Sequence, residues 1–274
     1  MNLAYRSKEM QKEIIVIRGG GDLGSGVAHR LHHGGFRVLI LELAQPLAVR
    51  RTVAFARAVI DGQTEVEGIT AVCVSSCAAA LQAWAAGQLP VMVDPQMQIL
   101  ADLPPEVLID ATLTKRETGL RKDMAPLTIA LGPGFEAGRH ADIVIETNRG
   151  PGLGRLIFKG AAAPDTGIPA PVRGRGPERV LRAPCGGTVR HVLDIGAAAS
   201  RGELICYVSN QPVTAPFNGI VRGLIMNGRA VAAGLKIGDI DPRQAKDSCY
   251  TISDKARALG DAALEAVEKN YAPL

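Results

Sequence analysis

The sequence predicts a mixed α/β protein with a parallel sheet domain, then a small all-β module and a C-terminal helix. Three observations predict this order. Short apolar runs alternate with helical or turn segments early in the chain, a glycine-rich turn joins the first run to a helix, and a tandem repeat with an offset of 32 residues follows later. Strands that alternate with helices are typical of a parallel sheet covered by helices.

The first apolar run leads directly into the glycine-rich turn. Residues 14–17 are β-branched without interruption, as in a strand buried on both faces, and a helix opens at Leu23. Gly19, Gly21 and Gly24 fit the pattern G-x-G-x-x-G, in which backbone N–H groups approach a pyrophosphate at a helix N-terminus. This context predicts a Rossmann-like nucleotide site. The alternative is a strand–glycine–helix turn that binds nothing, as other α/β folds contain.

Glu42 ends the next apolar run, at the position where a dinucleotide-binding fold places the carboxylate that binds the ribose hydroxyls, roughly 20 residues after the glycines. A carboxylate there favours NAD or another unphosphorylated adenosine, whereas Arg50 and Arg51 could accommodate an extra phosphate. We give Glu42 more weight because its position follows from the strand. The predicted cofactor-binding residues are Gly19, Gly20, Gly21, Asp22, Leu23, Gly24 and Glu42.

Further apolar runs predict the remaining strands of the sheet. The clearest helix runs from about Cys77 to Ala86, with Ser75 or Ser76 as its N-cap and Gly87 after its end. The strands are expected at residues 38–41, 70–74, 91–93, 107–109, 127–131, 143–145 and 156–158.

Polar side chains follow the ends of these runs. Ligands of an open parallel sheet bind beyond the carboxyl ends of its strands, so these side chains are candidates for a substrate or partner edge. A solvated rim of polar loops would also explain them. Residues 110–116 (DATLTKR) and 146–150 (ETNRG) nevertheless combine opposite charges with polar uncharged side chains directly after buried strands. The candidates are Arg50, Arg51, Asp110, Lys115, Arg116, Glu146 and Arg149.

Composition limits the classes of partner. A net charge of +4, scattered along 274 residues, does not provide the clustered basic face that nucleic acid requires. The length suggests two domains. The N-terminal segment lacks the apolar region of a signal peptide and no apolar run reaches membrane-spanning length, so we expect a cytoplasmic protein with no membrane contact.

Cysteine and histidine spacing does not indicate a metal site. Cys73 and Cys77 form C-x₃-C, but no second close pair or nearby histidine completes a zinc site. We expect the five cysteines to be ordinary reduced thiols. We therefore expect no metal, and no catalytic residue can be assigned from spacing.

The composition changes after Gly160. Residues 161–177 are rich in Ala, Pro and Gly and are typical of a linker. The repeat that follows predicts two similar β-hairpin units in tandem. The predicted domains are therefore 1–160, a linker at 161–177, a β module at 178–243 and a C-terminal helical segment at 244–274. The repeated pairs are Ala183/Ala215, Pro184/Pro216, Gly187/Gly219, Val189/Val221, Gly196/Gly228, Gly202/Gly234 and Ile205/Ile237.

The repeat resembles the barrel-sandwich fold of biotinyl and lipoyl carrier domains. Such carriers attach their cofactor to a lysine in the hairpin between the halves, but no lysine lies between Lys159 and Lys236. We therefore expect no biotin or lipoate. The module would instead be rigid, packing on the first domain or making a homo-oligomer contact. Asp239, Asp241 and Arg243 after the repeat form either a functional loop or, as we favour, the exit from the module.

Longer motifs carry a family resemblance that spans nearly the whole chain from about residue 14. They are residues 45–55 (QPLAVRRTVAF), 124–135 (MAPLTIALGPGF), 144–150 (VIETNRG), 236–243 (KIGDIDPR) and 253–257 (SDKAR). These segments resemble the selenium-dependent molybdenum hydroxylase accessory family, often called YqeB-like. The glycine-rich segment is also similar to the Rossmann domain of xanthine dehydrogenase accessory proteins. The resemblance implies a maturation role and contributes no catalytic residues.

Two hypotheses follow for the function. In the first, the chain is an accessory protein that binds a nucleotide or molybdopterin dinucleotide at the glycine loop and a molybdenum hydroxylase as its partner. In the second, it is an NAD-dependent oxidoreductase that uses the same loop with an unassigned acid or base. The sequence favours the first hypothesis, because no Ser-His-Asp or Cys-His arrangement can be argued from spacing.

Overall fold

The computed structural model describes residues 13–271, which form two compact units. The first unit contains residues 13–46, Phe55–Asp165 and 252–271, and the second contains Leu47–Ala54 and Thr166–Thr251. The units do not follow the predicted order of consecutive segments. Residues 47–54, expected within the domain 1–160, belong to the second unit, and the C-terminal helix, expected as a separate segment, belongs to the first.

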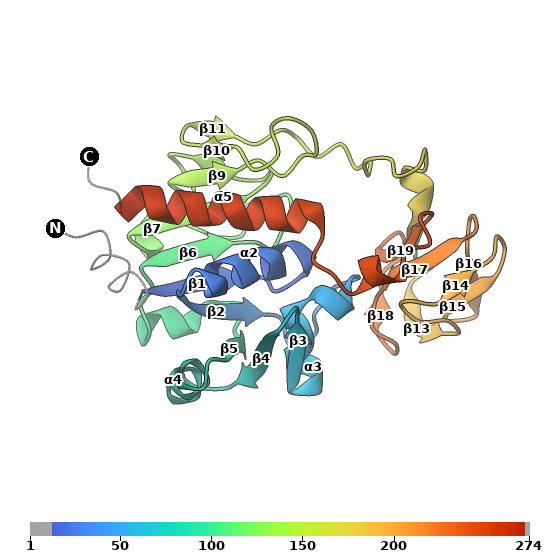
Figure 1. Ribbon diagram of the computed structural model, residues 1–274, viewed down its shortest axis with the longest axis horizontal. Coiled ribbons are helices and arrows are strands. Elements are labelled where there is room, and N and C mark those ends of the chain that lie inside the picture. Colours follow the sequence, from blue (N-terminus) through green and yellow to red (C-terminus); the bar gives the residue numbers. More distant parts are fainter. Residues whose placement is uncertain (1–12, 272–274) are drawn as a thin grey trace. The chain divides into compact units, whose positions relative to one another are not determined.

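The first unit is built on a nine-stranded sheet with the order β10-β9-β7-β6-β1-β2-β5-β4-β3. Every strand pair from β9 to β4 is parallel, whereas β10 and β3 pair antiparallel at the two edges (Figure 1). The strands are β1 (Ile14–Arg18), β2 (Arg37–Glu42), β3 (Gln63–Val66), β4 (Ile69–Val74), β5 (Leu89–Val93), β6 (Val107–Asp110), β7 (Leu127–Leu131), β9 (Ile143–Ile145) and β10 (Leu156–Ile157); β8 (Glu136–Ala137) and β11 (Gly160–Ala161) form a separate pair.

The expected mixed α/β architecture with a large sheet is confirmed. The centre of the sheet is apolar on both faces because its strands carry unbroken β-branched and aliphatic residues, of which Ile15, Val16 and Ile17 are fully buried. Each predicted apolar run lies within or overlaps an observed strand, and β7 and β9 have the predicted bounds.

Four helices accompany this sheet among the described residues: α2 (Asp22–His33), α3 (Ala58–Asp61), α4 (Cys77–Ala85) and α5 (Asp254–Tyr271). Ser76 caps α4 by accepting the backbone N–H of Ala79, as the sequence predicted. None of the helices described is long and apolar enough to cross a lipid bilayer.

Helices α2 and α5 lie side by side and run parallel (Figure 1). A Cβ at Gly26 would lie 2.6 Å from the Ala256 carbonyl oxygen, and a Cβ at Gly260 would lie 2.8 Å from the Arg30 Cβ. The two contacts are separated by the same number of residues on each helix, which fixes the parallel register. Glycine at both crossing points allows the backbones to approach closely.

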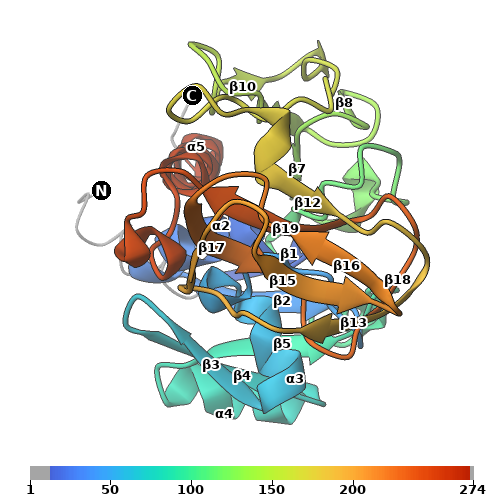
Figure 2. The ribbon, with the colours of Figure 1, turned by 90° about the vertical axis from the view of Figure 1, so that its right-hand side faces the viewer.

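The second unit contains two four-stranded antiparallel sheets, of order β12-β19-β17-β14 and β16-β15-β13-β18 (Figure 2). The strands are β12 (Val180–Arg182), β13 (Gly187–His191), β14 (Ala198–Ala199), β15 (Leu204–Val208), β16 (Gln211–Thr214), β17 (Gly219–Leu224), β18 (Ala230–Val231) and β19 (Lys236–Asp241). An expected all-β module is therefore present. Its assignment to the barrel-sandwich class stays a prediction.

The sequence repeat is visible in the strand order. An offset of 32 residues carries β13 onto the start of β17, β14 onto β18 and the start of β15 onto that of β19. If each strand is replaced by its counterpart in the other half, the strand order of one sheet becomes the strand order of the other. Each sheet therefore takes strands from both halves, and neither half can form a sheet of this kind alone.

Residues 47–54 complete the second unit and form a segment that we call the strap. The Val49 carbonyl accepts the backbone N–H of Leu224 at the end of β17, and the Thr52 hydroxyl donates to the Cys249 carbonyl. The strap contains the short 3₁₀ helix η1 (Arg51–Val53). These bonds join it to two other stretches of the second unit.

Candidate functional site

The glycine-rich turn lies where the strand order of the sheet reverses. From β1, the chain adds β2 on one side and later β6 on the other, and the turn follows the carboxyl end of β1. Ligands of open α/β sheets bind at such a switch point. Gly19 adopts φ +99°, and a Cβ there would lie 3.0 Å from the Ala111 carbonyl oxygen after β6. Only glycine satisfies both the backbone conformation and this close approach.

Hydrogen bonds hold the turn from several sides. The Gly19 N–H donates to the Leu41 carbonyl, and the Gly20 carbonyl accepts both the Ala56 N–H and the hydroxyl of buried Ser25. Ser25 in turn accepts the Phe55 N–H. The turn is thus preorganised by neighbouring backbone, which leaves less conformational entropy to lose when a ligand binds.

The three glycines of the motif have different surroundings. A Cβ at Gly21 would have no heavy atom within 4 Å, so this position is open. A Cβ at Gly24 would overlap the Gly19 carbonyl oxygen, so this glycine serves close packing of the helix on the turn. The division matches what a phosphate-binding turn needs: one glycine for the turn, one for ligand approach and one for packing.

The first turn of α2 faces this open position. Gly21 is the N-cap residue and provides no side-chain cap, so the first N–H groups of the helix lack the usual hydroxyl or carboxylate partner. Asp22 lies in that first turn, and the Leu23 side chain is partly exposed. Backbone N–H groups at the positive end of a helix dipole bind anions, phosphate in particular.

Glu42 lies beside the turn, as the sequence predicted, and its carboxylate contacts the backbone. One oxygen accepts the Gly20 N–H at 2.8 Å and the other accepts the Leu43 N–H at 2.7 Å. Burial raises the pKa of Glu42, although these two hydrogen bonds oppose the shift. Each oxygen retains a lone pair that could accept a ribose hydroxyl.

Asp110 and Arg18 connect the ends of β6 and β1. Asp110 is 1% exposed and accepts hydrogen bonds from the hydroxyls of Thr112 and Thr118, and Arg18 lies 3.5 Å from its carboxylate. Arg18 also donates to the carbonyl of Pro95. The candidate Asp110 therefore holds the loop after β6 in place, and its oxygens are occupied within the protein.

The other candidates of the first unit lie in loops after the strands. Buried Glu146 accepts the N–H groups of Asn148 and Ala163, each at 2.7 Å, so it holds the loop after β9. Lys115 pairs with Asp165 at 2.6 Å, and the guanidinium of Arg149 donates to both oxygens of Asp254. Arg116 is exposed. Most of these charges are thus committed to partners within the protein.

Arg50 and Arg51 belong to the strap, which is part of the second unit. Their side chains are 6% and 8% exposed. Arg50 donates to the carbonyls of Ser248 and Thr251, and Arg51 donates to the Leu224 carbonyl and pairs with Asp194. Both arginines anchor the strap, and their role at a substrate edge stays a prediction.

Lys255, which lies in the segment 253–257, is not among the site residues predicted from the sequence. It lies in the first turn of α5, and the charges of Asp22, Glu146 and Asp165 act on its ammonium group. Burial, followed by the charge of Arg149, lowers the pKa of Lys255 despite these carboxylates. No sequence signal could have placed it there, because the contact depends on the packing of α5 beside α2.

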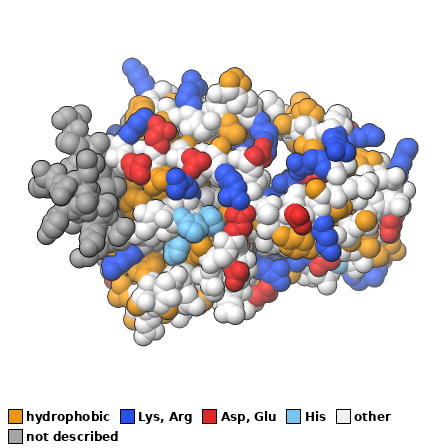
Figure 3. Space-filling view, in the orientation of Figure 1, with side chains coloured by type: hydrophobic (Ala, Val, Ile, Leu, Met, Phe, Trp, Pro, Cys, Tyr) orange, Lys and Arg blue, Asp and Glu red, His pale blue; other side chains and the backbone are white. Residues whose placement is uncertain are grey.

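Histidines form one patch on the face shown in Figure 3 (pale blue). The rings of His29 and His33 lie 4.5 Å apart, and burial lowers the pKa values of His29 and His32. Within residues 13–271 no group of three or more His, Cys, Asp or Glu side chains could hold a metal ion. The five cysteines are free thiols.

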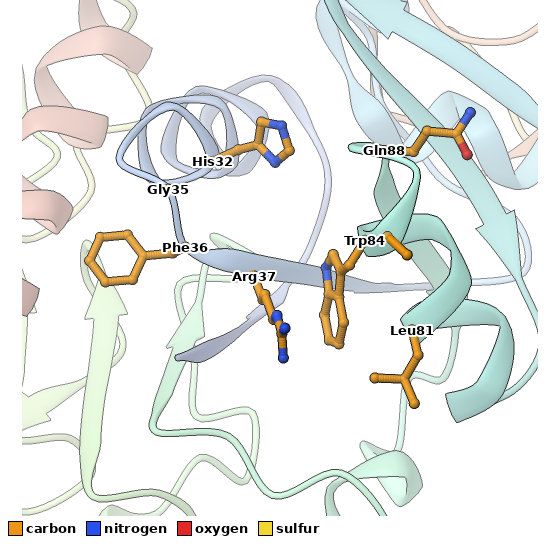
Figure 4. Close-up of a pocket in the computed structure, with 8 residues that line it drawn as sticks. His32, Gly35, Phe36, Arg37, Leu81, Trp84 and Gln88 are labelled. Carbon is orange, nitrogen blue, oxygen red and sulfur yellow. The ribbon is translucent and has the colours of Figure 1, made fainter. Parts of the chain in front are cut away.

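A separate cavity of about 330 Å³ lies near the amino end of β2 (Figure 4). Its lining includes His32, Phe36, Arg37, Leu81 and Trp84, and the indole N–H of Trp84 donates to the Val38 carbonyl. Because the glycine turn lies at the carboxyl end of β1 and beside Glu42 at the carboxyl end of β2, this cavity is not part of the candidate site.

Comparisons with known proteins give one close sequence relative. The chain is 48% identical over 255 residues to the uncharacterized protein YqeB of Escherichia coli (strain K12), a match that covers 93% of this chain and 47% of the relative. No family model matches the chain.

Solved structures give weaker likenesses. TcdA (CsdL) is 12% identical with a TM-score of 0.35, covering 97% of this chain and 90% of that one. The product-bound ectoine utilization protein EutE (DoeB) from Ruegeria pomeroyi is 11% identical with a TM-score of 0.25, covering 83% and 85%. These likenesses carry no argument about function. The chain is thus similar to YqeB along nearly all of its own length, and it spans about half the length of that relative.

Proposed function

We propose that this chain is an accessory protein for the maturation of selenium-dependent molybdenum hydroxylases and that it binds a nucleotide or molybdopterin dinucleotide at residues 19–24. The observation that carries the binding proposal is the open position at Gly21, which faces an uncapped helix N-terminus at the switch point of the sheet. A diphosphate fits this arrangement because backbone N–H groups and the helix dipole both favour its negative charge.

The surroundings of the turn support a nucleoside next to that diphosphate. Glu42 has acceptor capacity for the ribose hydroxyls. Leu43 directly follows β2 and Val93 ends the neighbouring strand β5, and the two residues are 46% and 41% exposed. Two exposed apolar side chains beside a sugar-binding carboxylate would provide a surface for a base. NAD and a pterin dinucleotide share this diphosphate–nucleoside half.

The accessory role rests on the family resemblance and on the state of the site's charged groups. Asp110, Glu146 and Arg149 are occupied by structural hydrogen bonds or ion pairs, so none of them is poised as a general acid or base. The alternative, an NAD-dependent oxidoreductase, would use the same turn, and Glu42 is the observation that favours it. In the accessory role, the second unit is the proposed contact for the hydroxylase.

Bound ligand is the test of the binding proposal. The full chain is purified gently, and its ligands are released with acid and analysed by mass spectrometry, beside a Gly21→Val variant prepared in the same way. We expect a pterin dinucleotide or an adenine dinucleotide from the wild type and none from the variant. Equal recovery from both proteins would remove the glycine turn from the site.

Co-expression with a selenium-dependent molybdenum hydroxylase tests the accessory role. We expect the hydroxylase to co-purify with the tagged chain and to contain less active cofactor in cells that lack the chain. A hydroxylase with full cofactor content and activity in such cells would contradict this role, while leaving nucleotide binding to be judged separately. Turnover of NAD with a small-molecule substrate would support the oxidoreductase instead.

A further inference from the structure

We propose that Lys255 is an anion-binding residue of this site and that its ammonium group contacts the diphosphate of the ligand held by the glycine turn. The inference rests on the proposed function, because it names a residue that binds the same ligand. The evidence for Lys255 is nevertheless separate, because it comes from the packing of α5 on α2 and from the surroundings of the ammonium group.

Helix packing places Lys255 beside the turn. Because α2 and α5 are parallel and Gly26 faces Ala256, Lys255 lies one residue before that contact, near the start of α2. The start of α5 is also held firmly: Glu67 accepts the Ile252 N–H at 2.8 Å and pairs with Arg257 at 2.7 Å. The backbone of Lys255, between these two anchors, is therefore well positioned.

The ammonium group of Lys255 lacks a partner of its own. Within residues 13–271 it makes no hydrogen bond and no ion pair within 4 Å, although its side chain is partly buried. Lys115, Lys122 and Lys269 differ in this respect, because each pairs with a carboxylate. Holding a charged group partly out of water without a partner is unfavourable, and a bound anion would offset that cost.

The carboxylates around Lys255 are already engaged elsewhere. Glu146 accepts two backbone N–H groups and Asp165 pairs with Lys115. They act on Lys255 at longer range, as does Asp22 at the start of α2, and the neighbouring cation Arg149 is paired with Asp254. Lys255 is thus a cation held near an anion-binding turn and available for a ligand.

This arrangement predicts that binding is coupled to protonation. Burial and Arg149 lower the pKa of Lys255 in the free protein, and a bound diphosphate would raise it. Affinity should therefore be highest below the pKa of the free lysine and should fall as pH rises through it, with proton uptake on binding. The groups that face the ammonium are Asp22, Glu146, Arg149 and Asp165.

Calorimetric titration of the full chain with NAD and with inorganic pyrophosphate tests the inference. We expect Lys255→Ala to weaken binding of either probe by about tenfold to a hundredfold, the range for a hydrogen bond between charged groups. Lys255→Arg should retain most of the affinity but lose the fall at high pH. Lys269→Ala is the matched control, since it removes the same charge from the far end of α5.

The outcomes separate this inference from the proposed function. If the wild type binds and Gly21→Val does not, unchanged affinity and pH profile in Lys255→Ala would overturn the role of Lys255 alone. If the wild type binds neither probe, both proposals are rejected for this ligand class. If Lys255→Ala unfolds at a lower temperature than the wild type, two other variants replace it in the comparison. Lys255→Met keeps the buried methylene chain without the charge, and Lys255→Arg keeps the charge.

Discussion

The carboxylate of Glu42 accepts the backbone N–H of Gly20 at 2.8 Å, so the end of β2 holds the turn that follows β1. The contact gives one residue two tasks. It fixes the glycine turn before any ligand arrives, and it keeps a negative charge where the ribose of a bound nucleotide would lie. The two tasks can be separated by changing the charge while keeping an acceptor oxygen.

Glu42 should select against a phosphorylated ribose. We expect the wild type to bind NAD on the order of tenfold more tightly than NADP, a difference of about 1.4 kcal/mol, because a 2′-phosphate would approach a carboxylate. Glu42→Gln should reduce this preference. Glu65→Gln, on exposed β3, is the control and should not change it. Direct titration measures the affinities of the three proteins for both ligands, and preference for NADP in the wild type would refute the assignment.

Gly24 and Gly21 should respond differently to the same substitution. Gly24→Ala places a methyl group against the Gly19 carbonyl, and we expect a loss of about 1–3 kcal/mol of stability even though alanine is the better helix former. Gly21→Ala meets no atom within 4 Å and should cost about 0.5 kcal/mol, the difference between the two residues as caps. Urea unfolding of both variants checks this, and equal losses would contradict the division of roles.

Asp241 should make the second unit sensitive to acid. It is fully buried, and although burial alone would raise its pKa, hydrogen bonds from Arg243 and the charges of Arg243 and Arg222 lower it. Because the folded pKa is below the ordinary value of about 3.9, its stabilising contribution is present above that pH and is lost as pH falls through it toward the folded value.

The Asp241→Asn variant tests this dependence. We expect it to lose about 1–3 kcal/mol near neutral pH, because it removes the carboxylate that pairs with Arg243, whereas Arg222 keeps Asp239. Its stability should also depend less on pH in the acid range. Asp123→Asn, at an exposed ion pair with Arg121, is the control and should change little. A wild type whose unfolding free energy is flat below pH 5 would count against the argument.

A fragment limited to residues 178–243 should be less stable than one that spans Thr166–Thr251, and both less stable than the full chain. Both fragments lack the strap, whose Thr52 hydroxyl donates to the Cys249 carbonyl, and the shorter fragment also lacks buried Cys249. Circular dichroism melting compares the three proteins. Thiol labelling is a second measurement of folding. Burial raises the pKa of Cys206 to about 11, so its thiol should react slowly with the label while the unit is folded.

The same fragments test for a covalent cofactor. We expect the unmodified mass, because the hairpin around Ser209, Asn210 and Gln211 between the two halves contains no amine. An adduct of biotinyl or lipoyl mass would restore the carrier hypothesis. A full-length protein with the same unmodified mass completes the comparison.

Sequence reasoning worked where the determining interactions are local. The runs that form β7 and β9 are short, apolar and bounded by turn residues, so their limits could be predicted. The repeat could be read because glycines at fixed spacing mark the turns of both halves. The position of Glu42 followed from the length of a single strand.

The remaining features depend on contacts between residues distant in sequence. Arg50 and Arg51 lie in the loop after β2, yet their partners Ser248 and Leu224 lie much later in the chain. The place of Lys255 follows from the contact of Gly26 with Ala256. The periodicity of apolar residues cannot show which distant residues pair. Arginine and lysine are also common on solvent-exposed surfaces, so their presence alone does not indicate a contact.

The placement of α5 determines the order in which the chain can fold as it is synthesised. Helix α2 leaves the ribosome long before the helix that covers its Gly26 face, because the whole β module lies between them in the sequence. The strap likewise emerges long before the strand that binds it. Neither unit can therefore be completed until these later segments have been synthesised, and the nascent chain must keep the apolar flank of α2 out of contact with other proteins until then.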